Sequence, residues 1–389
     1  MSRSFSLRSS RGFSLRLASA AFCTASLVSI LAVPSSARAQ GLFQPPSPTL
    51  TAGTAPQGVA AADFNRSGFM GLVVANSHVS GGGGGNSTVS VFLGTGNNAY
   101  GTGHAYSSCK NPTAVLAQDV NNDGYPDIIV ACTSSSTIGV LLNLGTGTFG
   151  TVTNYTFTGN PIALVSGDFL GNGRVDIAAA NSGGNIDVLV NNGTGTFSKS
   201  TVNISGTLSG IAAGDFNNDG HLDLAVSDSG GNKVDVLTGS GTGTFTLHGT
   251  GSAVGTGTKP SDIVAADFNN DGNLDVATTN AGNNTATILK GDGSGALTVQ
   301  AAQATGTDPI AIVATDVNGD GAPDVVAFDE LSTSTGEVDV LLGNGNGTLQ
   351  IAQTISQGFL PGTQAVVADF NRDGKPDIAL AQQNLNNAS

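Results

Sequence analysis

The sequence predicts an all-β protein, a seven-bladed β-propeller of four-stranded antiparallel blades with the last blade incomplete. A short acidic phrase, Asp-x-Asn-x-Asp-Gly-x-x-Asp in its full form, occurs in seven near-copies. The first begins at Asp63 and the last at Asp369, so 306 residues in six intervals give a mean period of 51. Such a recurrence is typical of repeat architectures, in which each unit buries its apolar faces against its neighbours. Each unit also carries short apolar runs that suit the four strands of a propeller blade.

The second unit shows the expected elements in order. Thr113–Ala117 is a small apolar strand that leads into the acidic phrase, and Ile128–Ala131 is the strand after it. Ile138–Leu142 forms the third strand, and the glycine-rich turn Gly145–Phe149 leads into a fourth strand that ends near Phe157. Short β-branched runs bounded by Gly and Asn indicate strands rather than helices. The second strands are apolar on both faces, which predicts that neighbouring blades cover them on both sides.

The two ends of the repeat region predict how the ring closes. The seventh unit stops at Asn386–Ser389, where its third strand should follow, whereas Gly41–Gln44 resembles a fourth strand that stands alone. We therefore expect the N-terminal segment to join the last blade, and that blade to lack its third strand. An open solenoid or a pair of β-sandwiches is the alternative architecture.

The first 39 residues have the pattern of a secretory signal peptide. Four arginines precede Leu17–Val33, a mostly apolar stretch without charge, and Ala37–Ala39 offers small residues at the cleavage positions. An uncleaved membrane anchor is the alternative, but the stretch is short for a span. We expect residues 1–39 to be removed and residues 40–389 to form the propeller. The mature chain should have no stable membrane span and should be secreted, periplasmic or at the cell surface.

The charge of the chain bears on its partners. The formal net charge is −14, and residues 1–39 hold five arginines and no acid, so their removal would leave −19. A strongly acidic chain lacks the basic surface that nucleic acids require, so we expect no nucleic-acid partner. Part of the negative charge lies in the acidic phrases, where bound cations would offset the repulsion.

Two cysteines, Cys109 and Cys132, lie before the first strand and after the second strand of the second unit. Export favours a disulfide between them. Two unpaired thiols are the alternative.

The acidic phrase has the ligand pattern of a calcium loop. In the copy from Asp267 to Asp275, the first, third and fifth residues carry side-chain oxygens and Gly272 permits the sharp turn. Asn273 can offer its carbonyl, and Asp275 can complete the coordination sphere. All-oxygen ligation with several carboxylates is the pattern that Ca²⁺ prefers.

An EF-hand is excluded for two reasons. It needs Glu at the twelfth position of the loop, and the five full copies have Val130, Val226, Thr278, Ala327 and Leu380 there. Their flanking elements are also strands. A hairpin turn of Asp, Asn and Gly that never holds a metal is the alternative.

The units resemble the FG-GAP/VCBS repeats of exported bacterial proteins and, more distantly, the propeller of integrin α-subunits. The resemblance covers Gly41 to the C-terminus, and it implies a Ca²⁺ ion in the loop between the first and second strands of each complete unit. It places the ligands at the first, third, fifth and ninth residues, with the carbonyl of the seventh. About five sites follow, with these residues: Asp119, Asn121, Asp123, Tyr125 and Asp127; Asp215, Asn217, Asp219, His221 and Asp223; Asp267, Asn269, Asp271, Asn273 and Asp275; Asp316, Asn318, Asp320, Ala322 and Asp324; Asp369, Asn371, Asp373, Lys375 and Asp377.

Two copies depart from the pattern. The copy at Asp63 has Ser67 and Gly71 where acids should be, and the copy at Asp168 has Leu170 and Asn172 at its third and fifth positions. We expect the first to hold no ion, and the resemblance leaves the second in doubt.

The sequence favours a calcium-binding interaction or adhesion module without catalytic residues or an organic cofactor. Its partner would be an extracellular protein or glycan that the sequence does not identify. A lectin-like propeller is one alternative, although the chain has no Trp to form a sugar platform. An extracellular hydrolase or lyase is another, but His78, His104 and His248 are scattered and form no polar cluster that breaks the repeat.

Overall fold

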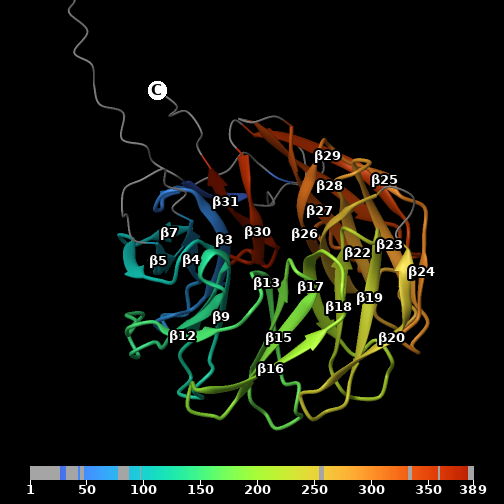
Figure 1. The fold of residues 1–389 in the computed structure, drawn as a ribbon. Coiled ribbons are helices and arrows are strands. Elements are labelled where there is room, and N and C mark those ends of the chain that lie inside the picture. Colours follow the sequence, from blue (N-terminus) through green and yellow to red (C-terminus); the bar gives the residue numbers. More distant parts are fainter. Residues whose placement is uncertain are drawn as a thin grey trace, which may run out of the picture.

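The computed structural model of the protein describes residues 27–31, 43, 48–77, 87–96, 98–253, 258–331, 335–357 and 360–383. Seven antiparallel sheets surround a common axis (Figure 1). The innermost strand of each sheet contacts that of the next, and β30 contacts β3, which closes the ring. These first strands are β3 (Pro56–Ala62), β9 (Pro112–Gln118), β13 (Pro161–Gly167), β17 (Leu208–Gly214), β21 (Pro260–Ala266), β26 (Pro309–Thr315) and β30 (Leu360–Ala368).

The remaining strands follow outward from the axis in sequence order within most sheets. The second strands are β4 (Gly71–Asn76), β10 (Asp127–Cys132), β14 (Asp176–Asn181), β18 (Asp223–Asp228), β22 (Asp275–Asn280), β27 (Asp324–Glu330) and β31 (Asp377–Gln383). The third strands are β5 (Thr88–Phe92), β11 (Thr137–Leu141), β15 (Asn185–Asn191), β19 (Lys233–Gly239), β23 (Thr285–Gly291) and β28 (Gly336–Gly343). The fourth strands are β8 (His104–Ser107), β12 (Thr153–Thr156), β16 (Phe197–Asn203), β20 (Phe245–Ala253), β24 (Leu297–Val299) and β29 (Leu349–Gln357).

The predicted propeller of four-stranded antiparallel blades is confirmed, with one correction to the number of strands in a blade. Six sheets have four strands, and the sheet that starts at β21 has five, because β25 (Gln303–Ala304) also pairs with β23. A separate two-stranded sheet joins β6 (Gly94–Gly96) and β7 (Ala99–Tyr100). The alternative architectures, an open solenoid or a pair of β-sandwiches, are excluded by the closed ring of first strands.

The last sheet corrects the expected closure. The N-terminal region does join it, but the order β2-β1-β31-β30 gives four strands, so the prediction of a missing third strand is wrong. Strand β1 (Leu27–Leu31) takes that place along β31, and β2 (Thr49–Thr51) takes the outer place. The backbone of β1, an apolar segment with β-branched residues, pairs with the free edge of β31. The strand expected at Gly41–Gln44 is therefore not needed to complete the blade.

Phe43 is the one residue of that expected strand that the structure describes. It lies outside the strands, is buried, and packs in the core cluster shared by the last two blades. Its N–H donates to Oε1 of Gln353. Strand β1 falls within the expected signal peptide, residues 1–39, whose other residues lie outside the described part. The boundary at residue 39 therefore stays a prediction.

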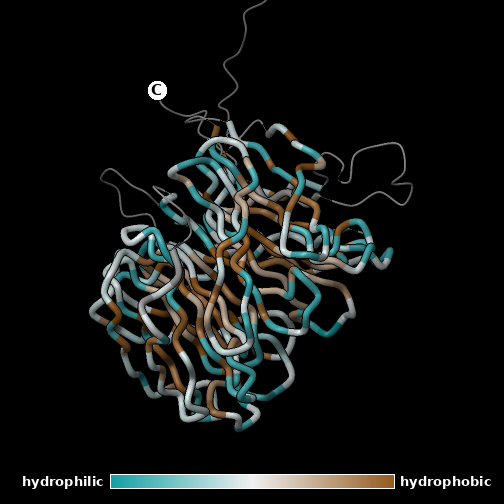
Figure 2. The backbone as a smooth tube through the Cα atoms, turned by 90° about the vertical axis from the view of Figure 1, so that its right-hand side faces the viewer, coloured by the Kyte–Doolittle hydropathy of each residue, from teal (hydrophilic) through white to brown (hydrophobic). Residues whose placement is uncertain are grey.

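The hydrophobic core lies between neighbouring sheets rather than in one central mass. Buried side chains from adjacent blades form separate clusters, such as the one that joins Val188 of β15 to Val226 of β18. All six residues of most second strands are buried, as the apolar pattern predicts. Figure 2 shows hydrophobic segments inside and hydrophilic loops outside.

A disulfide joins Cys109 and Cys132, with 5.7 Å between their Cα atoms. It connects the chain before β9 to the end of β10, so the expectation of a bridge within the second unit is confirmed. The only helical turn among the described residues is η1 (Thr133–Ser135), so no helix there has the length or the apolar character to cross a bilayer.

The contacts between blades predict where the chain is sensitive to truncation of a side chain. Phe216 is 1% exposed and packs in the cluster between β17 and β21, so Phe216→Ala should reduce the free energy of unfolding by roughly 3 to 5 kcal/mol. Leu144 is 67% exposed, and Leu144→Ala should change it by less than about 0.5 kcal/mol. Denaturant titration followed by circular dichroism measures both. Equal effects of the two substitutions would contradict this packing.

Candidate metal centres

The acidic phrases form the loops between the first and second strands, as expected. In the loop from Asp267 to Asp275, the N–H of Asp271 donates to Oδ1 of Asp267 at 3.1 Å and to Oδ1 of Asn269 at 2.8 Å. The N–H of Gly272 donates to the other oxygen of Asp267 at 2.8 Å. The oxygens of the first and third residues therefore converge on one point inside the loop. The other full loops repeat these bonds.

Two positions of each loop require a left-handed backbone. The sixth residue is always glycine with a positive φ, for example 88° at Gly272. The fourth residue also has a positive φ, for example 58° at Asn270, and Asn and Gly tolerate this region better than most residues. The sharp turn that the sequence predicts at the glycine is confirmed.

The fifth residue completes the group of oxygens at the loop. Oδ1 of Asp271 accepts from the N–H of Asn273, and Oδ2 accepts from the side-chain amide of Asn269. The side chains of the first, third and fifth residues are thus brought together on an exposed loop. The N–H of the seventh residue, Asn273 here, points toward the fifth. In the other full loops the seventh residues Tyr125, His221, Ala322 and Lys375 occupy the same place.

The ninth residue has a structural role that the pattern of metal ligands did not indicate. Asp275 is fully buried; its Oδ2 accepts from the N–H of Phe268 at 2.9 Å and its Oδ1 from the N–H of Gly291 at 2.8 Å. It therefore ties the end of the first strand to the end of the third. Asp127, Asp176, Asp223 and Asp324 make the same pair of bonds.

We call the ninth carboxylate with its two backbone bonds the clasp. Both oxygens of this expected ligand already accept a hydrogen bond from the backbone. Within the described residues, the acids of a repeat loop do not bring three ligand oxygens within 4.8 Å of one another. The first, third and fifth residues remain candidates for direct contact with an ion, because each oxygen keeps a free lone pair. The ninth residue acts first as a structural acceptor.

Burial changes the acidity of the clasp. It raises the pKa of Asp127, Asp275, Asp324 and Asp377 to about 6, although bonds from backbone N–H groups oppose the rise. The first and fifth carboxylates of the same loop raise these values further, since like charges disfavour ionisation. A bound cation would relieve that repulsion.

The two incomplete copies fold like the complete ones. The N–H of Ser67 donates to Asp63 at 2.9 Å, and the N–H of Asn172 donates to Asp168 at 2.9 Å. The first-position carboxylate and the glycine are therefore enough to set the loop, and the additional acids of the full copies are not needed for its shape. In the first blade Gly71 replaces the ninth acid, where a Cβ would lie 2.8 Å from the carbonyl of Phe92.

Neighbouring loops also contact each other, which the sequence did not predict. Nε of Arg66 donates to the carbonyl of Gly124 at 2.7 Å, and its guanidinium lies 4.2 Å from the ring centre of Tyr125. The side-chain amide of Asn218 donates to Asn273 of the next loop. The fourth residue of one loop thus reaches the seventh residue of the next.

The glycine-rich hairpin turns form part of the same junctions. The N–H of Gly295 donates to the carbonyl of Phe216, the second residue of the preceding loop, at 2.9 Å. Gly243 and Gly347 make the equivalent bond. These turns therefore dock on the previous blade.

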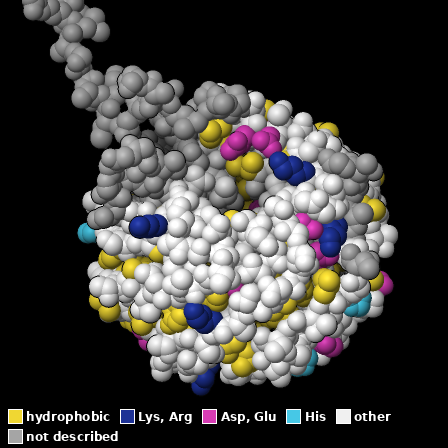
Figure 3. Space-filling model, viewed as in Figure 1, with side chains coloured by type: hydrophobic (Ala, Val, Ile, Leu, Met, Phe, Trp, Pro, Cys, Tyr) yellow, Lys and Arg dark blue, Asp and Glu magenta, His cyan; other side chains and the backbone are white. Residues whose placement is uncertain are grey.

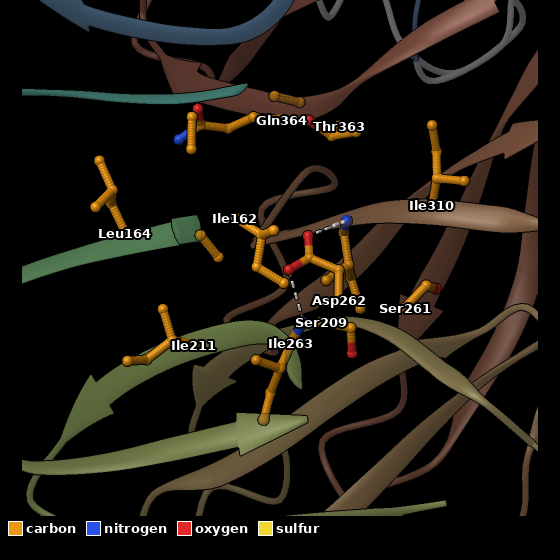
Figure 4. Close-up of a pocket in the computed structure, with 14 residues that line it drawn as sticks. Ile162, Leu164, Ser209, Ile211, Ser261, Asp262, Ile263, Ile310, Thr363 and Gln364 are labelled. Atoms are coloured by element: carbon orange, nitrogen blue, oxygen red, sulfur yellow. Dashed lines mark hydrogen bonds between the residues drawn. The ribbon is translucent and has the colours of Figure 1, made fainter. Parts of the chain in front are cut away.

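A cavity of about 170 Å³ lies on the axis, lined by residues of the first strands. Most of the residues that line it are aliphatic, and its polar members are Ser209, Ser261, Asp262, Thr363 and Gln364, all labelled in Figure 4. Asp262 accepts from the N–H of Ile263 at 2.9 Å and from the N–H of Ile312 in the next blade at 3.1 Å. Burial raises its pKa to about 7. The sequence did not single out this residue, because it lies in an apolar strand without a motif.

On the face drawn in Figure 3, basic side chains are few and separate. They form no continuous patch on that face. The expectation that the protein has no nucleic-acid partner stays a prediction. His104 lies in β8 of the first blade, whereas His221 and His248 lie in the fourth blade, in the loop before β18 and in β20. His78 lies outside the described residues.

The clasps predict how stability depends on pH when calcium is removed. Their pKa is raised from 3.8 to about 6, so the native state holds these protons longer than the unfolded chain does. Their stabilising effect is complete below about pH 4 and is lost as the pH rises through 6. Asp262, near 7, acts in the same direction.

Melting temperatures in chelator should therefore fall between pH 5 and pH 7.5, on the order of a few degrees. Saturating calcium should make the melting temperature depend less on pH, because a bound ion favours the charged form of the carboxylates. A metal-free protein that becomes more stable across this interval would contradict the prediction.

Comparisons with known proteins agree with this architecture. An FG-GAP-like repeat model matches residues 119–178, 168–226, 215–278, 267–327 and 328–380. The fold resembles the periplasmic gluconolactonase of Pseudomonas aeruginosa, with a TM-score of 0.62 and 17% identity over 86% of this chain and 97% of the other. It also resembles virginiamycin B lyase of Staphylococcus aureus, with 0.56 and 15% over 85% and 95%.

A third similar structure is an Agrocybe aegerita lectin that recognises non-reducing terminal N-acetylglucosamine, with a TM-score of 0.52 and 19% identity over 94% of this chain and 97% of the other. At these identities the likeness concerns the fold alone. No curated protein matches the chain. Because the repeat model matches more than half of the sequence, the protein belongs to the FG-GAP-like repeat family.

Proposed function

We propose that the protein is an exported, calcium-stabilised propeller that acts as a non-enzymatic module for adhesion or extracellular ligand recognition. The observation that carries the proposal is the repetition of the acidic loops. Five loops carry the same two acids and an amide on the same hydrogen-bonded frame, and every member recurs at the same place in its blade. A catalytic site seldom recurs in every repeat of a protein, whereas a site for a stabilising ion often does.

The oxygens of the first, third and fifth residues would hold each ion, with the seventh carbonyl. Calcium accepts six to eight oxygens in flexible geometry and takes water for the remainder. The ninth carboxylate, buried beneath the loop, would contribute its charge and one free lone pair. The loop of Asp63 lacks acids at its fifth and ninth positions, and the loop of Asp168 has Leu170 and Asn172 at its third and fifth, so five ions are proposed for seven loops.

The ions would act on the junctions between blades. Three of the loops contact the next through their fourth residue and its seventh, namely Arg66 and Tyr125, Asn218 and Asn273, and Arg372 and Phe69. Neutralising the loop acids would reduce repulsion around the ring at a place where the formal charge is high. Calcium is abundant outside cells, and the Cys109–Cys132 disulfide suits the same oxidising surroundings.

An enzyme is the second candidate, because of one observation. Asp262 faces the axial cavity, and its pKa of about 7 would suit a general acid or base. Two features favour a structural role instead. Both of its oxygens already accept bonds from backbone N–H groups, and one of these bonds links neighbouring blades. A lectin-like function is the other alternative; the chain has no Trp for a sugar platform.

Calcium should raise the melting temperature, and chelator should lower it. At a free concentration about a hundredfold above its dissociation constant, each ion adds about 2.7 kcal/mol to the free energy of unfolding. Asp271→Asn removes one loop carboxylate and should remove one bound ion, measured by equilibrium dialysis and elemental analysis. Asn172→Ala, in a loop that lacks the acids, is the matched control and should leave the count unchanged. Equal counts in all three proteins would contradict the proposed sites.

The interaction role predicts binding without turnover. Immobilised glycans and extracellular proteins should capture the calcium-loaded protein and release it in chelator. Lactone, ester and glycoside substrates should remain unchanged. Turnover that is present in the wild type and abolished by Asp262→Asn, in a variant that still melts normally, would favour the enzyme.

A further inference from the structure

The blade formed by β26, β27, β28 and β29 is unlike the others at the far end of its second strand. Asp329 of β27 lies opposite Glu337 of β28 in the antiparallel register, and Asp339 lies two residues further along β28. Directly opposed and diagonal residues on one face of a sheet are close neighbours. One carboxylate oxygen from each of the three lies within 4.8 Å of the others.

Two of these three acids are buried, and one has no partner. Asp329 is 0% exposed and Asp339 is 1% exposed, while Glu337 is half-buried. Asp339 accepts from the hydroxyl of Thr354 and from the N–H of Gly306. Neither oxygen of Asp329 accepts a hydrogen bond in the described part of the chain. A buried carboxylate without a donor or a counter-charge is costly, so this arrangement needs a further component.

Other blades show how the same two positions are normally satisfied. In the third blade, Asn181 takes the place of Asp329, and its amide donates to Asp187 at 2.8 Å. In the fifth blade, the amide of Asn280 donates to the hydroxyl of Thr287 at 2.9 Å. Each pair is a donor matched with an acceptor. The blade of Asp329 has two acceptors instead.

The fourth blade also has two carboxylates there, and it supplies a cation. Asp228 and Asp235 take the places of Asp329 and Asp339. Lys233 takes the place of Glu337, and its ammonium lies 2.7 Å from Asp235. Asp228 is satisfied by three backbone N–H groups. A third acid in place of this lysine makes the formal charge of the site more negative by two and removes its cation.

We propose that Asp329, Glu337 and Asp339 bind one hard divalent cation, Ca²⁺, at a site separate from the repeat loops. The site lies at the opposite end of β27 from the clasp residue Asp324, which begins that strand. Three carboxylates supply oxygens of the kind that calcium prefers, and water can fill the remaining positions. The half-buried Glu337 leaves the ion a route from solvent.

The chain that covers the site approaches the three acids closely. Gly306 lies over the three acids, where a Cβ would come within 2.2 Å of Oε1 of Glu337 and 3.0 Å of the Cβ of Asp329. Its N–H orients Asp339 at 2.7 Å. A side chain at this position would displace the carboxylate of Glu337, and one of the three acids, Asp339, is already held in place.

The alternative to an ion is a shared proton. Burial, and then the charges of Asp339 and Glu337, raise the pKa of Asp329 to about 8. Thr305 and Gly306 oppose part of the rise without reaching hydrogen-bond geometry at its oxygens. A proton would neutralise one acid only, whereas a divalent ion would neutralise two and bind all three. The experiment must separate these two states.

Asp329→Asn in the full chain tests the proposal, because it rebuilds the pair that Asn181 and Asp187 form. The variant should bind one fewer calcium ion per chain than the wild type, by equilibrium dialysis and elemental analysis. It should also melt at a higher temperature than the wild type in chelator, since an amide donor replaces an unpartnered acceptor. Glu337→Lys, which copies Lys233, should lose the same ion and is the second variant if the first fails to fold.

Asp316→Asn is the matched control in the loop at the other end of the blade. It should lower the calcium count independently of Asp329→Asn, and it should give no gain of stability in chelator. If only Asp329→Asn and Glu337→Lys lose an ion, the loops do not bind calcium and the present site stands. Wild-type counts in both of those variants would show that the acids share protons, and the proposal would be overturned.

Discussion

The buried carboxylate at the ninth position of the acidic phrase is the interaction on which five of the seven blades depend. It begins the second strand and accepts one N–H from the end of the first strand and another from the end of the third. Three strands are thus fixed at one end by a single side chain. Because the acceptor lies among apolar residues, the bonds are shielded from water and their loss would leave two buried donors unpaired. The exposed part of the loop then projects from a fixed base.

This arrangement explains why the loops can vary in their acids without losing their shape. Leu170 and Asn172 replace two potential ligands, and the loop of Asp168 still forms. Conformation comes from the first carboxylate and the glycine, and the buried acid, where it is present, ties the loop to the end of the third strand. Ion binding is an additional property of the loops that carry more oxygens. The same separation between frame and ligand is seen at the other end of the blades, where Asn, Asp and Thr exchange within one backbone geometry.

The sequence predicted the fold well because the fold is periodic. Strands, turns and the positive-φ glycines follow from residues that recur in every unit, so seven observations support each assignment. It predicted less where an element occurs once. The place of β1 beside β31 depends on a single pairing of distant segments, and the loop contact of Arg66 depends on geometry between blades. Neither Asp262 nor Asp329 belongs to a sequence motif. Only the fold shows that Asp262 faces the axis and that Asp329 lacks a hydrogen-bond donor.

The pairing of β1 with β31 has a consequence for maturation. Removal of residues 1–39 by an export protease would take β1 away and leave the main-chain groups of Asp377–Gln383 without their neighbour on that side. A vacated edge of this kind accepts extended peptides readily. Cleavage after residue 39 would therefore exchange the strand that completes the last blade for an open edge.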